Sequence, residues 1–189
     1  RQERAFCVAV VGGGPAGVEL AAELAIFLQK LARLHRVDPD VCRVILLEAG
    51  DTFLRECPPR LRERGLERLR ALGVRLRPKH EVCTIGPEHL ACSGGRFLRT
   101  DTVVWLAGVR THDVLLHSGL PVHPRGGLYT DEHLAVRGHP SIFAVGDCVY
   151  AEDFKTGRMV PDVAYAAVQQ GAVVAQNVLR KLRGQLPIS

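Results

Sequence analysis

The sequence predicts a three-layer α/β fold with a parallel sheet and an inserted β-meander, followed by a second, smaller domain. Two observations carry this prediction. Residues 7–48 form a strand, helix and strand pattern with a glycine-rich turn after the first strand. Short apolar runs separated by proline and glycine follow a second helix and indicate a β-meander. A strand, helix, strand unit with a glycine-rich first turn is a βαβ unit, so the sheet should be parallel and the crossover right-handed.

The elements of the first domain, residues 1–110, follow from local patterns. Apolar runs such as CVAVV (7–11) predict buried strands, and apolar residues spaced three and four apart predict helices. Gly73 is placed to end the second helix. The expected elements are, in order, strand 7–11, helix 15–35, strand 43–48, helix 60–72, meander strands 74–77, 81–85, 89–92 and 96–98, and strand 102–106.

The second domain is expected to cover residues 111–189. It opens with a loop-rich stretch, followed by a strand at 142–145 that delivers Gly146 and Asp147 into a loop. A final helix is expected from about Pro161 to Leu182. We expect an exposed sheet edge and apolar surface in this part of the chain.

The charge pattern argues against nucleic-acid binding. The net charge is +5, and 21 of the 25 basic residues are arginines, many of them in residues 55–79. Glutamates alternate with these arginines, and leucines form an apolar stripe at helical spacing. Because no stacking aromatic residues accompany the charge, a solvated outer helix face is the better interpretation.

From composition we expect a folded chain without a membrane span, in a reducing compartment. Hydrophobic residues make up 47% of the chain, but no run of 18 apolar residues and no signal peptide are visible. The six cysteines form no Cys-x-x-Cys pair, which indicates free thiols. We expect no metal site. The chain starts without an initiator methionine, and we expect it to be part of a longer protein.

The turn VVGGGPAGVE (10–19) carries the chemistry of dinucleotide binding. In a G-x-G-x-x-G pattern between a strand and a helix, the first glycine permits the tight turn and the second lets the backbone approach a pyrophosphate. The third allows close packing of helix on strand, and the helix N-terminus then faces the phosphates. The predicted residues of this loop are Gly12, Gly13, Gly14, Pro15, Ala16 and Gly17.

Two acidic residues are candidates beside this loop. Glu48 ends the second strand, 31 residues after Gly17, where a carboxylate accepts hydrogen bonds from ribose hydroxyls. It would repel a 2′-phosphate, and residues 49–52 contain no arginine, so NADH is favoured over NADPH. Glu19, expected on the first turn of the helix, is placed near the nicotinamide, although its charge also suits a helix N-terminus by itself.

Five stretches in matching order resemble the flavoprotein reductases in which an NADH domain is inserted into an FAD domain. Within that superfamily the chain is most similar to type II NADH:quinone oxidoreductase. The family's first FAD glycine motif and its membrane-docking segment have no counterpart in this sequence. The stretches are GGGPAGVELAAEL (12–24), RVDPDVCRVILLEAGD (36–51), VVWLAGV (103–109), GLPVHPRGGLYTDEHLAVRGHPSIFAVGDC (119–148) and AVQQGAVVAQN (167–177).

The resemblance implies a Rossmann-like NADH-binding domain followed by the C-terminal part of a split FAD-binding domain, with FAD and NADH as cofactors. It implies that Asp147 accepts hydrogen bonds from the FAD ribityl chain and that Gly146 lets the backbone come close. Ala107 and Gly108 would pass beside the nicotinamide ribose. The N-terminus of the final helix would face the flavin, with Val163, Ala164 and Tyr165 as contacts and Gln169 and Gln170 near flavin and quinone. Tyr165 stands where the family has glutamine, which leaves the electron acceptor open.

The resemblance also implies partners and a location. Hydride would pass from NADH to FAD, and electrons would pass on to a quinone or another small acceptor. We expect a cytoplasmic protein at the inner face of the membrane, held there through segments outside this chain, and a homodimer is one expected assembly. Two alternatives stay open: a flavoprotein of the disulfide-reductase type, and a non-catalytic NADH-binding module.

Overall fold

The computed structural model describes residues 5–153, 157–160 and 163–189. The chain divides into two compact units, Arg1–Gly108 and Val109–Ser189. The predicted α/β fold with a parallel sheet is confirmed, and the parallel sheet lies in the first unit. None of the described helices combines the length and apolar character needed to cross a membrane.

The sheet of the first unit orders its parallel strands β3-β2-β1-β7. All six residues of β1 pair in register with β2. Because the strands are parallel, their carboxyl ends meet at one edge, where ligands bind in open α/β sheets. The strands are β1 (Phe6–Val11), β2 (Cys42–Leu47), β3 (Arg75–Arg77) and β7 (Thr102–Trp105).

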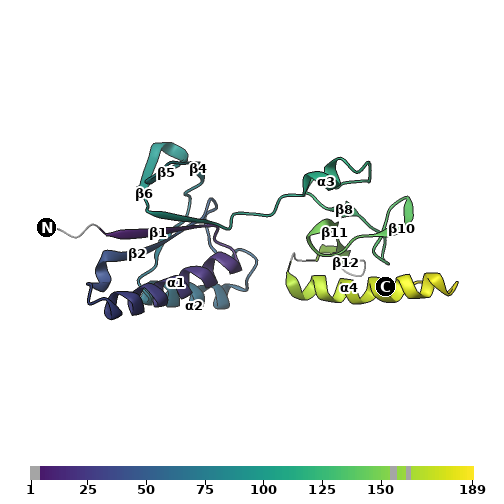
Figure 1. The fold of residues 1–189 in the computed structure, drawn as a ribbon, viewed down its shortest axis with the longest axis horizontal. Helices are drawn as coiled ribbons and strands as arrows, with labels where there is room; N and C mark the ends of the chain where they lie inside the picture. Colours follow the sequence, from purple (N-terminus) through teal and green to yellow (C-terminus); the bar gives the residue numbers. More distant parts are fainter. Residues whose placement is uncertain (1–4, 154–156, 161–162) are drawn as a thin grey trace. The chain divides into compact units, whose positions relative to one another are not determined.

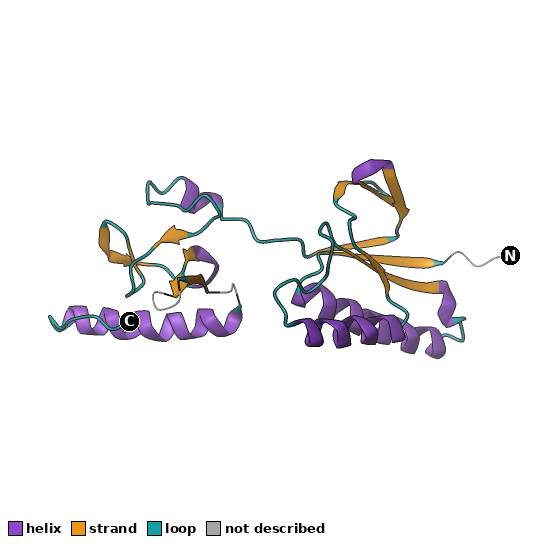
Figure 2. Ribbon diagram, turned by 180° about the vertical axis from the view of Figure 1, so that it is seen from behind, coloured by secondary structure: helices purple, strands orange, loops and turns teal. Residues whose placement is uncertain are grey.

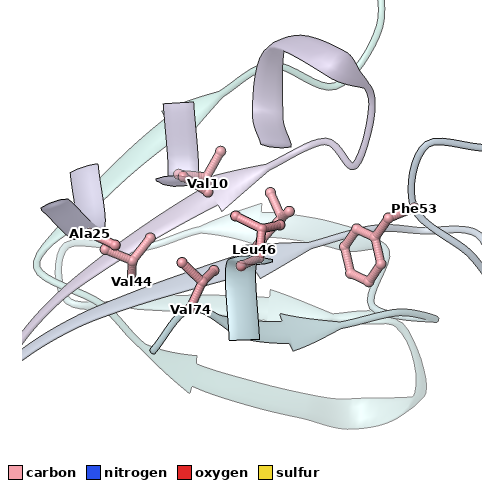
Figure 3. Close-up of a cluster of buried hydrophobic side chains, with 8 residues drawn as sticks. Val10, Ala25, Val44, Leu46, Phe53 and Val74 are labelled. Atoms are coloured by element: carbon pink, nitrogen blue, oxygen red, sulfur yellow. The ribbon is translucent and has the colours of Figure 1, made fainter. Parts of the chain in front are cut away.

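Two helices, α1 (Pro15–Leu34) and α2 (Pro59–Ala71), cover one face of this sheet (Figure 1). The small residues Ala21 and Ala25 of α1 are buried and let the helix approach the strands closely. Figure 3 shows the cluster they join, in which side chains of β1 and β2 meet Phe53 from the loop after β2. Burial of this apolar surface is the main stabilising term of the layer.

A three-stranded antiparallel meander covers the opposite face of the sheet (Figure 2). Successive side chains of a strand point to opposite faces; accordingly Val10 packs with the helices, whereas Ala9 and Val11 pack with Leu90 of the meander. The first unit therefore has three layers. The strand expected at 74–77 as part of the meander is instead β3, which pairs with β2 in the parallel sheet. The meander consists of β4 (Val82–Ile85), β5 (His89–Cys92) and β6 (Arg96–Arg99), and short 3-10 turns cover Pro39–Val41 and Ser93–Gly95.

The second unit combines short strands with one long helix, α4 (Ala164–Leu182). Its core contains Leu128, Val136 and Val149. The side chain of Asn177 on α4 is buried and hydrogen-bonded to the backbone of His133 and Ile188. The remaining elements are α3 (Asp113–Leu116), β8 (Leu128–Tyr129), β9 (Ala135–Val136), β10 (His139–Phe143), a 3-10 turn (Gly146–Cys148), β11 (Val149–Tyr150), β12 (Glu152–Asp153) and β13 (Arg158–Met159).

Two boundaries in the second unit differ from the expected ones. The strand expected at 142–145 is β10, which begins at His139 and ends at Phe143. The apolar run is only partly buried, with Ile142 exposed and Ala144 buried, and the pairing of β10 with β9 begins earlier, at His139. The helix α4 begins at Ala164; its expected start at Pro161 lies outside the described residues.

Candidate functional site

The glycine turn joins β1 to α1 through contacts that exclude side chains. Gly12 has a φ of +119°, and a Cβ there would lie 2.5 Å from the carbonyl oxygen of Leu106. A Cβ at Gly17 would lie 1.9 Å from the carbonyl oxygen of Gly12. Real Cβ atoms do not approach oxygens that closely, so both positions require glycine.

The N-terminus of α1 opens onto free space. Gly14 is the N-cap residue, has extended backbone and provides no side-chain cap, and Pro15 occupies the first helical turn. A Cβ at Gly14 would meet no atom within 4 Å. The first N–H groups of a helix have no partners within the helix, and the helix dipole makes this end attractive to anions. The turn can therefore hold a pyrophosphate.

Glu48 lies directly after β2, and its carboxylate holds the glycine turn through hydrogen bonds. Its Oε2 accepts a hydrogen bond from the Gly13 N–H at 2.8 Å, and its Oε1 accepts one from the Gly50 N–H at 2.7 Å. The side chain is half-buried. Each carboxylate oxygen has a second lone pair, so both can still accept a hydroxyl. The carboxylate is thus held in one orientation beside the space that a ribose would fill.

The β2–α2 loop (residues 48–58) folds over the glycine turn and encloses a cavity of about 530 Å³. The Leu54 N–H donates to the Gly13 carbonyl oxygen at 2.8 Å, and Leu54 itself has a φ of +49°. A branched residue at positive φ is strained, so this loop needs outside support. The cavity is lined by Gly13, Gly14, Pro15, Glu48, Gly50, Thr52, Leu54, Arg55, Glu56 and Cys57.

Arg62 of α2 supplies that support. Its Nε donates to the Leu54 carbonyl at 3.2 Å, and its Nη2 donates to the carbonyls of Arg55 and Cys57 at 2.9 and 3.1 Å. The sequence interpretation missed both Arg62 and Arg55, since it assigned the arginine-rich stretch to a solvated helix face. The signal that could have found them is position: Arg55 lies in the loop that follows Glu48, and Arg62 lies in the first turn of the helix after that loop.

A second cavity, of about 400 Å³, lies on the other side of the glycine turn. The two cavities share Gly13, Gly14 and Glu48. Trp105 and Leu106 at the end of β7 form one wall, together with Ala107 and Gly108. The other wall comes from His80, Glu81 and Val82 before and within the meander. A molecule extended across the carboxyl edge of the sheet could occupy both cavities at once.

The predicted position of Glu19 on the first helical turn is wrong. The helix begins at Pro15, so Glu19 is its fifth residue, and the first turn contains no acidic side chain. Glu19 is exposed, and it is not among the residues that line either cavity. The helix dipole falls off within one turn, which weakens the electrostatic reason for an acid at this position. Ala16, also predicted, is exposed beside Pro15.

In the second unit, Gly146 and Asp147 lie in a 3-10 turn after β10. Gly146 has a φ of +60°, and its N–H donates to Oε1 of Gln170 on α4 at 2.7 Å. Gln170 therefore holds the turn against the helix. The Asp147 side chain is exposed and lines two small cavities of about 10 and 50 Å³, so its oxygens are available as acceptors.

The N-terminal turns of α4 are exposed. Val163 is the N-cap residue and carries no side-chain cap, and Ala164 begins the helix. The Tyr165 side chain is 73% exposed, and Nε2 of Gln169 donates to its hydroxyl at 2.7 Å. Tyr165 is thus hydrogen-bonded to Gln169, which lies one helical turn later.

Two cysteines of the first unit have raised thiol pKa values, and both lie in its core and line neither cavity. Burial between the sheet and the meander raises the pKa of the Cys7 thiol, and the Asp101 carboxylate adds to this effect. Burial likewise raises the pKa of Cys92. Neither thiol is activated as a nucleophile. Within residues 5–153, 157–160 and 163–189, no group of three or more His, Cys, Asp or Glu residues could hold a metal ion.

The chain matches known proteins along most of its length. The family described as pyridine nucleotide-disulphide oxidoreductase matches residues 2–171. Type II NADH:quinone oxidoreductase of Haemophilus influenzae is 33% identical over 174 residues, which are 90% of this chain and 39% of the relative. Type II NADH:quinone oxidoreductase of Mycobacterium tuberculosis is 32% identical over 198 residues, which are 99% of this chain and 41% of the relative.

Solved structures share the fold. A ferredoxin reductase of Rhodopseudomonas palustris superposes with a TM-score of 0.73 at 23% identity, covering 97% of this chain and 43% of its own. A water-forming NADH oxidase of Lactobacillus brevis, bound to NADH, has a TM-score of 0.71 at 22% identity, covering 94% of this chain and 37% of its own. This chain therefore spans about two fifths of the length of the curated relatives reported above.

Proposed function

We propose that this chain, which belongs to the pyridine nucleotide-disulphide oxidoreductase family, is the NADH-binding part of a flavin-dependent NADH oxidoreductase with a quinone-type acceptor. The observation that carries the proposal is the Glu48 carboxylate, fixed by the N–H groups of Gly13 and Gly50 between two cavities at the carboxyl edge of the sheet. The names of the relatives, NADH:quinone oxidoreductases, support the reaction.

The residues present fit NADH. Gly12 and Gly17 admit no side chain, and the open N-terminus of α1 at Gly14 suits the pyrophosphate. Glu48 would accept hydrogen bonds from the hydroxyls of the adenosine ribose in the cavity of about 530 Å³. Trp105, Ala107 and Gly108 would enclose the nicotinamide ribose in the other. The protein's contribution to hydride transfer is orientation and exclusion of water rather than acid–base chemistry.

The second unit is proposed to contribute to FAD binding. Its fit rests on the exposed Asp147 carboxylate in a turn whose Gly146 N–H is held by Gln170. Bound FAD would accept the hydride and pass its electrons to the acceptor. The cap-free N-terminus of α4, with Val163, Ala164 and Tyr165, would place its positive end toward the flavin. We assign Gln170 a positioning role, and Gln169 a polar contact for flavin or quinone through its pair with Tyr165.

The wider setting of the reaction is part of the same proposal. A quinone is lipid-soluble, so the whole protein would work at the inner, cytoplasmic face of a membrane and could do so as a homodimer. Glu19 is exposed in the second turn of α1 and lines neither cavity, so it would approach the nicotinamide only from outside them.

A calorimetric titration of this chain with NADH tests the proposal. We expect Glu48→Gln to weaken NADH binding about tenfold, because charge-assisted hydrogen bonds to the ribose are replaced by weaker ones. Glu63→Gln, which removes an exposed charge from α2, is the control and should leave the affinity within twofold. A folded sample that binds no NADH would end the proposal, and equal effects of the two substitutions would remove Glu48 from it.

A further inference from the structure

Arg55 and Glu48 face the same small volume over Gly50. A Cβ at Gly50 would lie 2.6 Å from Nη2 of Arg55 and 3.0 Å from Oε1 of Glu48. Both side chains also line the cavity of about 530 Å³. A guanidinium nitrogen and the ribose-binding carboxylate therefore flank one point, where the ribose hydroxyls of a bound nucleotide would be read.

The backbone of Arg55 is held by hydrogen bonds, whereas its side chain is mostly exposed. Its carbonyl oxygen accepts from Arg62 at 2.9 Å, and the preceding residue donates to Gly13. Nη2 of Arg55 contacts Asp51 at 3.4 Å, and the two side chains are 69% and 71% exposed. Exposed ion pairs of this kind are weak, so a stronger anion can displace Asp51.

A phosphate is such an anion. The planar guanidinium presents parallel N–H donors that match phosphate oxygens, whereas Arg55 makes a single contact of 3.4 Å with Asp51. Glu48 by itself would repel a 2′-phosphate. With Arg55 beside it, the site contains a carboxylate that favours a free 2′-hydroxyl and a guanidinium that can bind a 2′-phosphate.

We propose that Arg55 lets this chain accept NADPH as a second substrate, with Glu48 keeping NADH preferred. The inference rests on the proposed function, because it concerns the adenosine end of the same nucleotide. It revises the expectation from sequence, which considered only residues 49–52 after Glu48 and found no arginine there. Arg55 comes later in the chain but is returned to Gly50 by the β2–α2 loop.

The test uses two probes that lack nicotinamide, ADP-ribose and 2′-phospho-ADP-ribose, titrated into the chain by calorimetry. Arg55→Gln should weaken binding of the phosphorylated probe about 5- to 10-fold at low salt, as expected for loss of a charge-assisted pair. ADP-ribose affinity should change less than twofold. The matched control is Arg64→Gln, which removes the same charge from an exposed position on α2 and should change neither affinity more than twofold.

Two further arms separate the outcomes. Arg55→Lys should restore part of the affinity for the phosphorylated probe, and raised salt should shrink the Arg55→Gln effect. If Arg55→Gln weakens both probes equally or neither, the inference is overturned while the proposed function stands. If the folded chain binds neither probe, both fall together.

Discussion

The two units present their candidate ligand groups in opposite ways. In the first unit, Glu48 and the glycine turn are held by backbone hydrogen bonds around cavities of about 530 and 400 Å³. In the second unit, the Asp147 side chain is exposed beside cavities of about 10 and 50 Å³. The first unit therefore has preformed cavities that fit the proposed nucleotide, whereas the second unit offers acceptor atoms on an exposed turn.

The largest effect on this difference between the units is expected from a side chain introduced into the glycine turn. Gly12→Ala places a methyl group against the Leu106 carbonyl and forces a strained φ, so the free energy of unfolding should fall by about 3 kcal/mol. NADH binding should be lost. Chemical denaturation and calorimetry measure the two effects.

Gly14→Ala is the matched control. A Cβ there meets no atom within 4 Å, and the φ of −73° suits alanine. This variant should fold with nearly unchanged stability. Equal stability of the two variants would show that the turn is not closed as described.

The support of the β2–α2 loop can be removed next. Arg62→Met leaves the carbonyls of Leu54, Arg55 and Cys57 without this donor, and the cost should be about 1–2 kcal/mol. Hydrogen exchange across residues 54–57 should quicken, and NADH should bind more weakly. Arg68→Met, at an exposed position of the same helix, should produce neither change.

A smaller change should affect the second unit alone. Gln170→Ala removes the acceptor of the Gly146 N–H and should cost about 1 kcal/mol. NADH affinity should stay within twofold, because Gln170 lies outside the first unit. Gln176→Ala on the exposed side of α4 serves as control. A loss of NADH affinity in Gln170→Ala would contradict the separation of roles.

The smallest expected effect is a pH dependence that distinguishes the thiols of the two units. Burial raises the pKa values of Cys7 and Cys92 above the ordinary 9.0. The folded state thus favours the neutral thiols, so their contribution is fully present below about pH 9 and is lost as the pH rises further. Between pH 8 and 10, the melting temperature of Cys7→Ala should fall less than that of the unchanged chain, because the variant lacks one of these thiols. The exposed Cys148 should react with thiol reagents well before either buried residue, and simultaneous reaction would contradict the described core.

The first unit could be predicted from sequence in most respects because long periodic elements carry strong signals. CVAVV followed by glycines and an apolar helical stripe is enough to indicate β1, the turn and α1. The glycine-turn residues and Glu48 came from the same pattern. Arg55 and Arg62 did not, because their importance depends on a loop conformation, with Leu54 at positive φ, that local sequence does not reveal.

The second unit was predicted less completely for a related reason. The strands β8, β9, β11, β12 and β13 have two residues each, too few for a period-two pattern to appear. The hydrogen bond between Gln170 and Gly146 joins residues 24 positions apart, and no local rule places them together. Asp147 could be indicated through the resemblance, but the role of Gln170 in holding its turn became visible with the structure.

The clamp that Glu48 forms between Gly13 and Gly50 has a kinetic consequence. The hydrogen bonds that shape the turn, including that from Leu54 to Gly13, exist before any nucleotide arrives. Binding then has little chain to order, which removes one of the main entropic costs of association. Encounter with NADH should therefore be a single fast step in stopped-flow traces, without the slow second phase of a closing loop, and the residence time rather than the approach should set the affinity.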